Sequence, residues 1–263
     1  MKSPFPPKCV SRFFALVMVV ALSVGAYGQQ GRGGAPAPPR SPKDSAPIDL
    51  TGYWVSVVTE DWRFRMVTPP KGDFPDWPLN PAGRALANAW DPAKDEAAGN
   101  QCKGYGAASL MRVPSRYHIT WQDDNTLKIE ADAGTQTRLL HFGGAKPSGP
   151  PSLQGYSAAE WQNALGAAGR AAQKGGPPRG GSLKVVTTNL TPGYLQKNGV
   201  PYSAQTTVTE YYDIVKEPDG EQWLIVKTFV DDPVYLTRPH ISSPNLKKQR
   251  DASGWNPTPC TVR

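Results

Sequence analysis

The clearest pattern of hydrophobic and polar residues lies in residues 116–142, where alternating runs are separated by turn-forming residues. Apolar and polar side chains alternate over residues 117–122 and again over residues 127–132, with the period of strands that bury one face. Residues 123–125 and 132–134 have the composition of tight turns. The stretch therefore predicts an antiparallel β-meander.

The first turn of the meander sets a register. With residues 123–125 as a three-residue loop, Trp121 faces Leu127 and His118 faces Glu130. Trp121 and Leu127 then share an apolar face, and His118 and Glu130 share the polar face behind it.

The second turn extends the polar face. A three-residue loop at 132–134, with its glycine left-handed, places Lys128 opposite Arg138. Arg138 then joins His118 and Glu130 in a polar row, which we interpret as the solvated face of the sheet. If the row faced the interior instead, Glu130 would orient His118 as a general base.

Alternation continues on both sides of the meander. It predicts strands in residues 50–60, 62–67, 182–189, 203–215 and 223–230, with a hairpin turn at Lys197-Asn198-Gly199.

Helices are predicted where N-cap residues precede good helix formers. Asn80-Pro81 and Asp91-Pro92 each combine an N-cap with proline at the first helical position, and predict short helices in residues 82–98. The capping box Ser157–Glu160 precedes an alanine-rich run and predicts an inserted helix over residues 158–174.

These elements define a fold class. The runs number about eight or nine strands, mostly joined by tight turns. We predict a mainly β fold: a single antiparallel up-and-down β-barrel, lipocalin-like, with an inserted helix and short N-terminal helices. A β-sandwich is the alternative. The barrel domain spans residues 48–263, and its helical insertion spans about 143–181.

The N-terminus has the pattern of a signal peptide. Basic residues precede the apolar residues 13–25, and small residues at Ala26 and Gly28 predict cleavage after Gly28, hence a periplasmic or secreted protein. The apolar run is shorter than the roughly 20 residues that cross a bilayer, so no stable membrane span is expected after cleavage. Residues 29–47, rich in Gly and Pro, predict a disordered tether.

Cysteine usage agrees with export. Cys9 leaves with the signal peptide, so Cys102 and Cys260 remain as an even pair. We expect a disulfide between them, two free thiols being the alternative. Closing so long a loop would stabilise the fold by roughly 4 to 5 kcal/mol in the chain-entropy model.

The charge balance excludes one class of partner. The full chain has a net charge of +7, of which the first 28 residues carry three basic and no acidic side chains, so that +4 remains. No run of five or six Lys and Arg occurs, and nucleic-acid binding is not expected.

The three histidines do not form a metal motif. A site would need His118, His141 and His240 to converge with Asp231 or Asp232, but no H-x-H or H-x-x-x-H spacing supports this. The predicted register also places His141 on the opposite face from His118. Because a G-x-S-x-G motif and a phosphate loop are missing as well, we expect neither metal nor cofactor.

Aromatic residues give the remaining signal. All eight Trp residues belong to the mature chain, and most of them are expected to be core. In a barrel, inward-facing aromatic side chains line a cavity, and Trp54, Trp121, Tyr211 and Trp223 are the candidates for a pocket that binds an apolar or aromatic small molecule. Plain core packing is the alternative.

Six motifs span most of the mature chain: WQDDNTLKIEADAGTQTRLLHF (121–142), GYSAAEW (155–161), GSLKVVTTNLTPGYLQKNGVPYS (181–203), VTEYYDI (208–214), DDPVYL (231–236) and WNPTPC (255–260). They resemble a group of uncharacterised secreted bacterial proteins that are β-rich and have a lipocalin-like (calycin-like) look. The resemblance implies export and an antiparallel β scaffold, and it supplies no catalytic residues. Gly52-Tyr53-Trp54 is a degenerate form of the lipocalin G-x-W motif.

The function expected from the sequence is binding of a small hydrophobic or amphipathic ligand by an exported, non-catalytic barrel. The competing hypothesis is an isomerase, hydratase or hydrolase on the same scaffold, with His118, Glu130 or Asp213 as acid or base. A third is a structural or envelope-interaction module without a ligand cavity.

Overall fold

The computed structural model describes residues 40–144, 147, 149–163 and 180–262 of the chain. The predicted signal peptide, residues 29–39 of the tether and residues 164–174 of the predicted inserted helix lie outside these ranges.

The described elements are mainly strands. The strands are β1 (Gly52–Val57), β2 (Arg116–Asp123), β3 (Thr126–Ala131), β4 (Gln136–His141), β5 (Tyr156–Asn163), β6 (Gly181–Thr188), β7 (Gly193–Gln196), β8 (Val200–Tyr202), β9 (Thr207–Lys216), β10 (Gln222–Asp231), β11 (His240–Ser242) and β12 (Asn245–Lys248). The helices are α1 (Trp62–Met66), α2 (Pro81–Ala89) and α3 (Pro92–Ala97), with 3₁₀ turns η1 (Gln101–Tyr105) and η2 (Leu110–Arg112).

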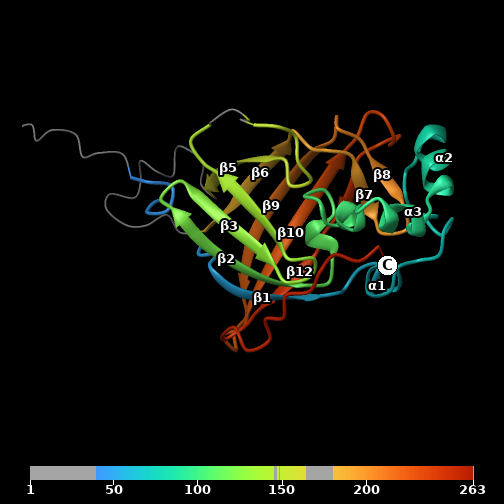
Figure 1. Cartoon of the computed structure of the whole chain (residues 1–263). Coiled ribbons are helices and arrows are strands. Elements are labelled where there is room, and N and C mark those ends of the chain that lie inside the picture. The colour runs from blue at the N-terminus through green and yellow to red at the C-terminus, as the bar shows by residue number, and fades with distance from the viewer. Residues whose placement is uncertain (1–39, 145–146, 148, 164–179, 263) are drawn as a thin grey trace, which may run out of the picture. The chain divides into compact units, whose positions relative to one another are not determined.

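Nine strands close into a barrel in the order β10-β12-β1-β2-β3-β4-β5-β6-β9, and β9 pairs with β10 to complete the ring (Figure 1). This closed ring confirms the predicted mainly β, lipocalin-like barrel. The pairs are antiparallel except β4 and β5, which run parallel and share only two register pairs. The barrel is therefore not strictly up-and-down at this one position.

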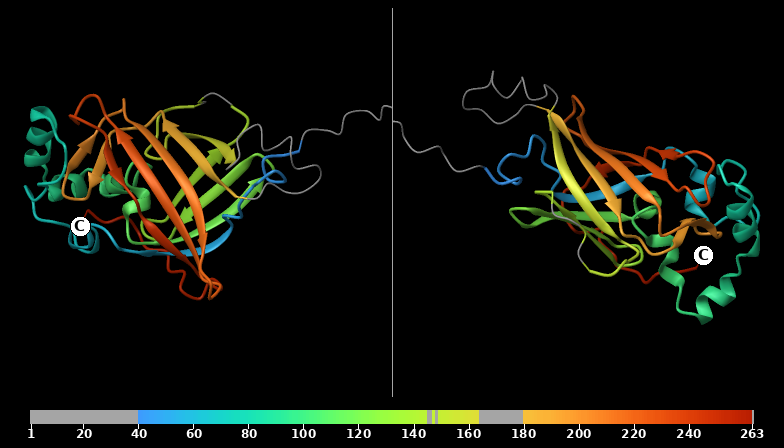
Figure 2. Two further views of the ribbon diagram at one scale, coloured as in Figure 1. Left: turned by 180° about the vertical axis from the view of Figure 1, so that it is seen from behind. Right: turned by 90° about the horizontal axis from the view of Figure 1, so that it is seen from above.

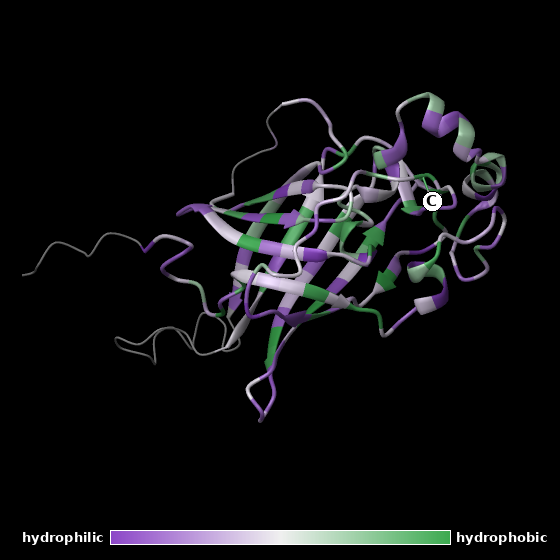
Figure 3. Ribbon diagram, turned by 60° about the horizontal axis from the view of Figure 1, so that its bottom comes forward, coloured by the Kyte–Doolittle hydropathy of each residue, from purple (hydrophilic) through white to green (hydrophobic). Residues whose placement is uncertain are grey.

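Alternating side chains fill the barrel. Hydrophobic and hydrophilic residues alternate along the strands, as the colours of Figure 3 show. On β9, Val208, Glu210 and Tyr212 are buried, while the residues between them face outward. One apolar cluster fills the barrel around Trp54, and a second cluster gathers around Trp77.

One end of the barrel is covered by α1, α2, α3 and the β7–β8 hairpin, as three views agree (Figures 1 and 2). The capping predictions are confirmed: the Asn80 side chain accepts from the Gly83 N–H, and the Asp91 side chain accepts from the N–H groups of Ala93 and Lys94. In the ranges that the structure describes, no helix is both long and apolar enough to cross a membrane.

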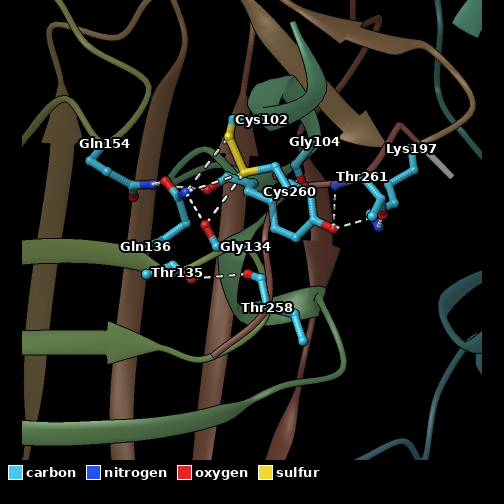
Figure 4. The surroundings of a disulfide bond; sticks show 12 residues. Cys102, Gly104, Gly134, Thr135, Gln136, Gln154, Lys197, Thr258, Cys260 and Thr261 are labelled. Carbon is cyan, nitrogen blue, oxygen red and sulfur yellow. Dashed lines mark hydrogen bonds between the residues drawn. A yellow bond between two sulfur atoms is a disulfide. The ribbon is translucent and has the colours of Figure 1, made fainter. Parts of the chain in front are cut away.

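The expected disulfide joins Cys102 in η1 to Cys260 in the C-terminal tail (Figure 4). The side chain of Gln136 lies beside it, 3.4 Å from the Cys260 sulfur, and donates to the Gly134 carbonyl at 2.6 Å. The bridge fixes the tail against the capped end of the barrel.

The register of the meander is confirmed in its first hairpin and wrong in its second. Trp121 pairs with Leu127 and His118 with Glu130, as predicted.

In the second hairpin, Lys128 pairs with Leu139 rather than with Arg138. Both Gly134 and Thr135 have positive φ, 78° and 49°, so the loop contains one residue more than the predicted three. A shift of one residue moves every later side chain to the other face. Arg138 consequently points into the barrel.

Two segments have a different secondary structure from the one predicted. The capping-box residues Ser157–Glu160 lie in β5, which pairs with β6 along its length, so the helix prediction is wrong over residues 158–163. Pairing with β6 outweighs the helix propensity of the alanines. Residues 62–66, predicted as strand, form α1, which buries Arg65 and leaves Trp62 exposed.

Order begins before Ile48, so the predicted tether is wrong over residues 40–47. The Trp161 indole N–H donates to the Pro42 carbonyl at 2.8 Å, and the Lys43 N–H donates to the Asp124 carbonyl at 3.2 Å. These hydrogen bonds hold the segment against the barrel despite its proline content.

Candidate functional site

The four aromatic residues expected to form a pocket do not converge. Trp54 is fully buried in the barrel, and Trp121 is partly buried and packs against the edge of the same cluster. Tyr211 and Trp223 face outward from β9 and β10, because the residues beside them on each strand are the buried ones. The expectation of a shared pocket is therefore wrong for Tyr211 and Trp223.

The barrel core around Trp54 is filled. Trp54, Tyr117, Ile129, Leu183 and Tyr212 have no exposed surface at all. A void large enough for water would expose part of the side chains that border it, so these residues are close-packed. They do not border a ligand cavity.

The conditional polar site does not form in the interior. His118 Nδ1 lies 3.3 Å from Glu130 Oε2, and Lys128 Nζ lies 3.0 Å from the same oxygen, with all three side chains about a third exposed on the outer face. The His118 ring stacks on Tyr53 with centroids 4.1 Å apart. Arg138, which was expected in this row, is inside the barrel.

The other candidate acid, base and metal groups are also dispersed. His141 alternates with the buried residues of β4 and so lies on the same outer face as His118, contrary to the predicted register. Asp213 faces outward and pairs with Lys227 at 3.1 Å. Across the described ranges, no three His, Cys, Asp or Glu residues cluster in a way that could hold a metal ion.

A buried ion pair occupies the barrel interior. Arg138 Nη2 donates to Glu210 Oε2 at 2.5 Å and to Thr187 Oγ1 at 2.7 Å, and Arg138 Nε donates to Ser157 Oγ at 3.0 Å. Burial opposes the charge of Arg138, but the facing carboxylate of Glu210 outweighs it and raises the pKa of Arg138. Both side chains are inaccessible to solvent, so the pair serves the fold rather than a ligand.

A cleft of about 600 Å³ opens at the capped end, with walls from α1, η1, η2 and β7. Its apolar walls include Phe64, Met66, Val67, Val113 and Leu195, and its cationic residues are Arg65, Arg112 and Lys197. No carboxylate occurs among the described residues that line it. The cleft is therefore amphipathic and positively charged.

Two of the cations are buried beside each other. The side chains of Arg65 and Arg112 are only 2% and 9% exposed. Arg65 Nε donates to the Arg112 carbonyl at 2.8 Å, and Arg112 Nη2 donates to Asp61 Oδ2 at 3.1 Å. Burial and the neighbouring charge of Arg112 both lower the pKa of Arg65.

Aromatic rings support this arginine pair. The guanidinium group of Arg112 lies 5.4 Å from the centre of the Trp77 ring, which stacks on His240 with centroids 3.9 Å apart. Burial and the charge of Arg112 lower the pKa of His240 to about 4. His240 is consequently neutral at neutral pH and adds no charge to the cleft.

The third cation of the cleft, Lys197, lies near the disulfide (Figure 4). Lys197 Nζ donates to Thr261 Oγ1 at 3.0 Å and lies 4.5 Å from the centre of the Tyr105 ring. Burial raises the pKa of Tyr105, but hydrogen bonds with Lys197 and Thr261 outweigh it and lower that pKa overall. The C-terminal tail thus helps to position Lys197.

Sequence reasoning missed Arg65 and Arg112 as site residues. Arg65 lies in the run WRFRM, whose alternation predicts a strand, and Arg112 lies in the 3₁₀ turn η2 before β2. The only signal in the sequence was that both arginines lie among large apolar residues. This signal does not show that Arg65 and Arg112 come together in one site.

Comparisons with protein-family models, with curated proteins and with solved structures find no match for this chain. The fold and the cleft therefore define the class by themselves: a closed, nine-stranded, lipocalin-like barrel with a cationic cleft at its capped end.

Proposed function

We propose that this chain is an exported, non-catalytic barrel protein that binds a small amphipathic ligand in the cleft at its capped end. The observation that carries the proposal is the lining of the cleft, where apolar side chains lie beside Arg65, Arg112 and Lys197. Such a lining suits a ligand with an apolar body and a negative charge. The barrel interior, in which the sequence predicts the ligand pocket, is filled by side chains around Trp54.

Exposed apolar residues beside the cleft support the proposal. Trp62, Met66 and Val67 are 69%, 60% and 71% exposed, and Met66 and Val67 line the cleft. Apolar side chains that gather on a surface commonly mark a binding site. The cleft volume also lies within the range of small-molecule sites, roughly 300 to 1,000 Å³.

Binding is favoured over the two competing hypotheses. The enzyme hypothesis needs an acid or base at the ligand, and the groups expected in that role, His118, Glu130 and Asp213, do not line the cleft. A module without a cavity does not account for a cleft of about 600 Å³.

The experiment is native mass spectrometry of the chain purified from the periplasm, comparing wild type with two matched variants. Met66→Glu places a negative charge on an exposed cleft residue, whereas Leu86→Glu makes the same kind of change at a 47% exposed position on α2 outside the cleft. We expect a ligand with wild type and Leu86→Glu, and none with Met66→Glu. Absence of ligand from wild type in several growth conditions, or its retention by Met66→Glu, would refute the proposal.

A further inference from the structure

We infer that the ligand of the cleft is a monocarboxylate with an apolar body, and that Arg65 and Arg112 bind its carboxylate. This inference rests on the proposed function and specifies the class of ligand.

The first argument is the set of hydrogen-bond donors without acceptors. Nη1 and Nη2 of Arg65 and Nη1 of Arg112 are buried and have no hydrogen-bond partner in the described part of the chain. The nearest carboxylate oxygen to Arg65 Nη1, Glu60 Oε1, is 4.0 Å away and already accepts from the Ser243 N–H at 2.9 Å. A buried donor without an acceptor costs free energy, and the cost is larger when the donor is charged. Three such donors on neighbouring residues are best satisfied by an oxyanion.

The second argument is geometric. A carboxylate accepts two parallel N–H bonds from one guanidinium group, which Nη1 and Nη2 of Arg65 can supply, and a remaining lone pair can accept from Nη1 of Arg112. The hydrogen bond from Arg65 Nε to the Arg112 carbonyl holds the Arg65 side chain against the backbone of Arg112. The carboxylate meets their free N–H groups when these groups turn toward the cleft that both residues line.

The third argument is the charge balance, which selects a single negative charge. Arg65, Arg112 and Lys197 supply three positive charges, and Glu60 and Asp61, the carboxylates paired with the two arginines, supply two negative charges. One positive charge is left over. A carboxylate neutralises it, whereas a phosphate monoester, which carries about two negative charges at neutral pH, exceeds it.

The apolar walls provide for the rest of the ligand. Phe64, Met66 and Val67 line the cleft beside Arg65, and Val113 follows Arg112 directly in the chain. An alkyl or aryl body attached to the carboxylate would cover these side chains and remove apolar surface from water.

The test is isothermal titration calorimetry of the purified chain at pH 7 with octanoate, octanol and octyl phosphate. These compounds have the same alkyl chain and differ only in the head group. We expect octanoate to bind at least ten-fold more tightly than either of the others. Equal affinity for octanol or octyl phosphate would overturn the monocarboxylate class. If none of the three binds although a ligand co-purifies, this inference fails and the proposed function stands; if no ligand co-purifies either, both fail.

Two variants test the residues. Arg112→Lys keeps the charge and removes the planar fork, so octanoate affinity should fall at least ten-fold while octanol affinity is unchanged. Arg63→Gln is the control, because Arg63 is 67% exposed on α1, the helix of Arg65, and does not line the cleft. Unchanged octanoate affinity in Arg112→Lys, or an equal loss in Arg63→Gln, would refute the assignment. If Arg112→Lys does not fold, the ligand series with wild type still decides.

Discussion

Arg138 and Glu210 form an ion pair inside the closed barrel, with both side chains wholly excluded from solvent. Arg138 extends from β4 to partners on three other strands: Ser157 on β5, Thr187 on β6 and Glu210 on β9. A buried pair of this kind is weak evidence for net stability, because desolvation of both charges offsets their attraction. Loss of one partner alone is costly, since it leaves a buried charge unpaired.

The variant Glu210→Gln should therefore lower the free energy of unfolding by about 3 to 5 kcal/mol, as measured by urea denaturation. The control is Glu160→Gln, which breaks the exposed pair with Lys184 and should cost about 0 to 1 kcal/mol. If both variants lowered the free energy of unfolding by the same amount, breaking the buried pair would cost no more than breaking the exposed one.

His240 should make the fold sensitive to acid. Its pKa is about 4 in the folded chain and 6.5 when unperturbed, so the unfolded state takes up the proton first as the pH falls. Above pH 6.5 the residue has no effect; between about pH 6.5 and 4 it lowers the free energy of unfolding by at most about 3 kcal/mol. His240→Phe retains an aromatic ring against Trp77. In that pH window it should reduce the slope of the free energy of unfolding against pH by the equivalent of about one proton. An unchanged slope would contradict this assignment.

Gly199 and Gly220 offer a matched test of close packing. Both have a φ of 89°, but a Cβ on Gly199 would overlap the Trp90 side chain, whereas one on Gly220 meets nothing within 4 Å. Gly220→Ala should cost about 1 to 2 kcal/mol from backbone strain alone. Gly199→Ala should cost about 1 to 3 kcal/mol more because of the overlap. Thermal unfolding of both variants checks the difference, and equal costs would exclude a packing role for Gly199.

The disulfide should contribute strongly to stability. Cys102 and Cys260 are 158 residues apart, and closing a loop of that length is worth roughly 4 to 5 kcal/mol in the chain-entropy model. Denaturation of wild type and of the double variant Cys102→Ser/Cys260→Ser measures this, with wild type under reducing conditions as a second comparison. A double variant as stable as the oxidised chain would rule out the effect.

Local signals in the sequence predicted much of the fold. The Trp121–Leu127 register, the caps at Asn80 and Asp91, and the disulfide each depend on a few neighbouring residues or on counting cysteines. The number of alternating runs predicted a barrel with a β-sandwich as the alternative, and the pairing of β9 with β10 closes the ring.

Long-range effects caused the failures. The capping box at Ser157 and Glu160 predicts a helix from local sequence, whereas pairing with the distant β6 places these residues in a strand. The position of Arg138 depends on Thr135 adopting a positive φ, which its side chain does not favour.

The candidate site was harder to predict than the fold. Arg65 and Arg112 come from a short helix and a 3₁₀ turn, 47 residues apart in the chain, and only the packing of the barrel cap brings them together. Alternation along a strand shows which side chains are inside a sheet, but it gives no information about segments that pack over its end.

The parallel pairing of β4 with β5 determines how the ring comes apart. Those strands share two register pairs, whereas β9 and β10 share ten, so β4 and β5 are the neighbours that separate most easily. The hydrogen bond from Arg138 to Ser157 crosses this junction from inside. If β4 and β5 separated, the barrel would become an open sheet with two unpaired edges, and exposed strand edges are templates for aggregation.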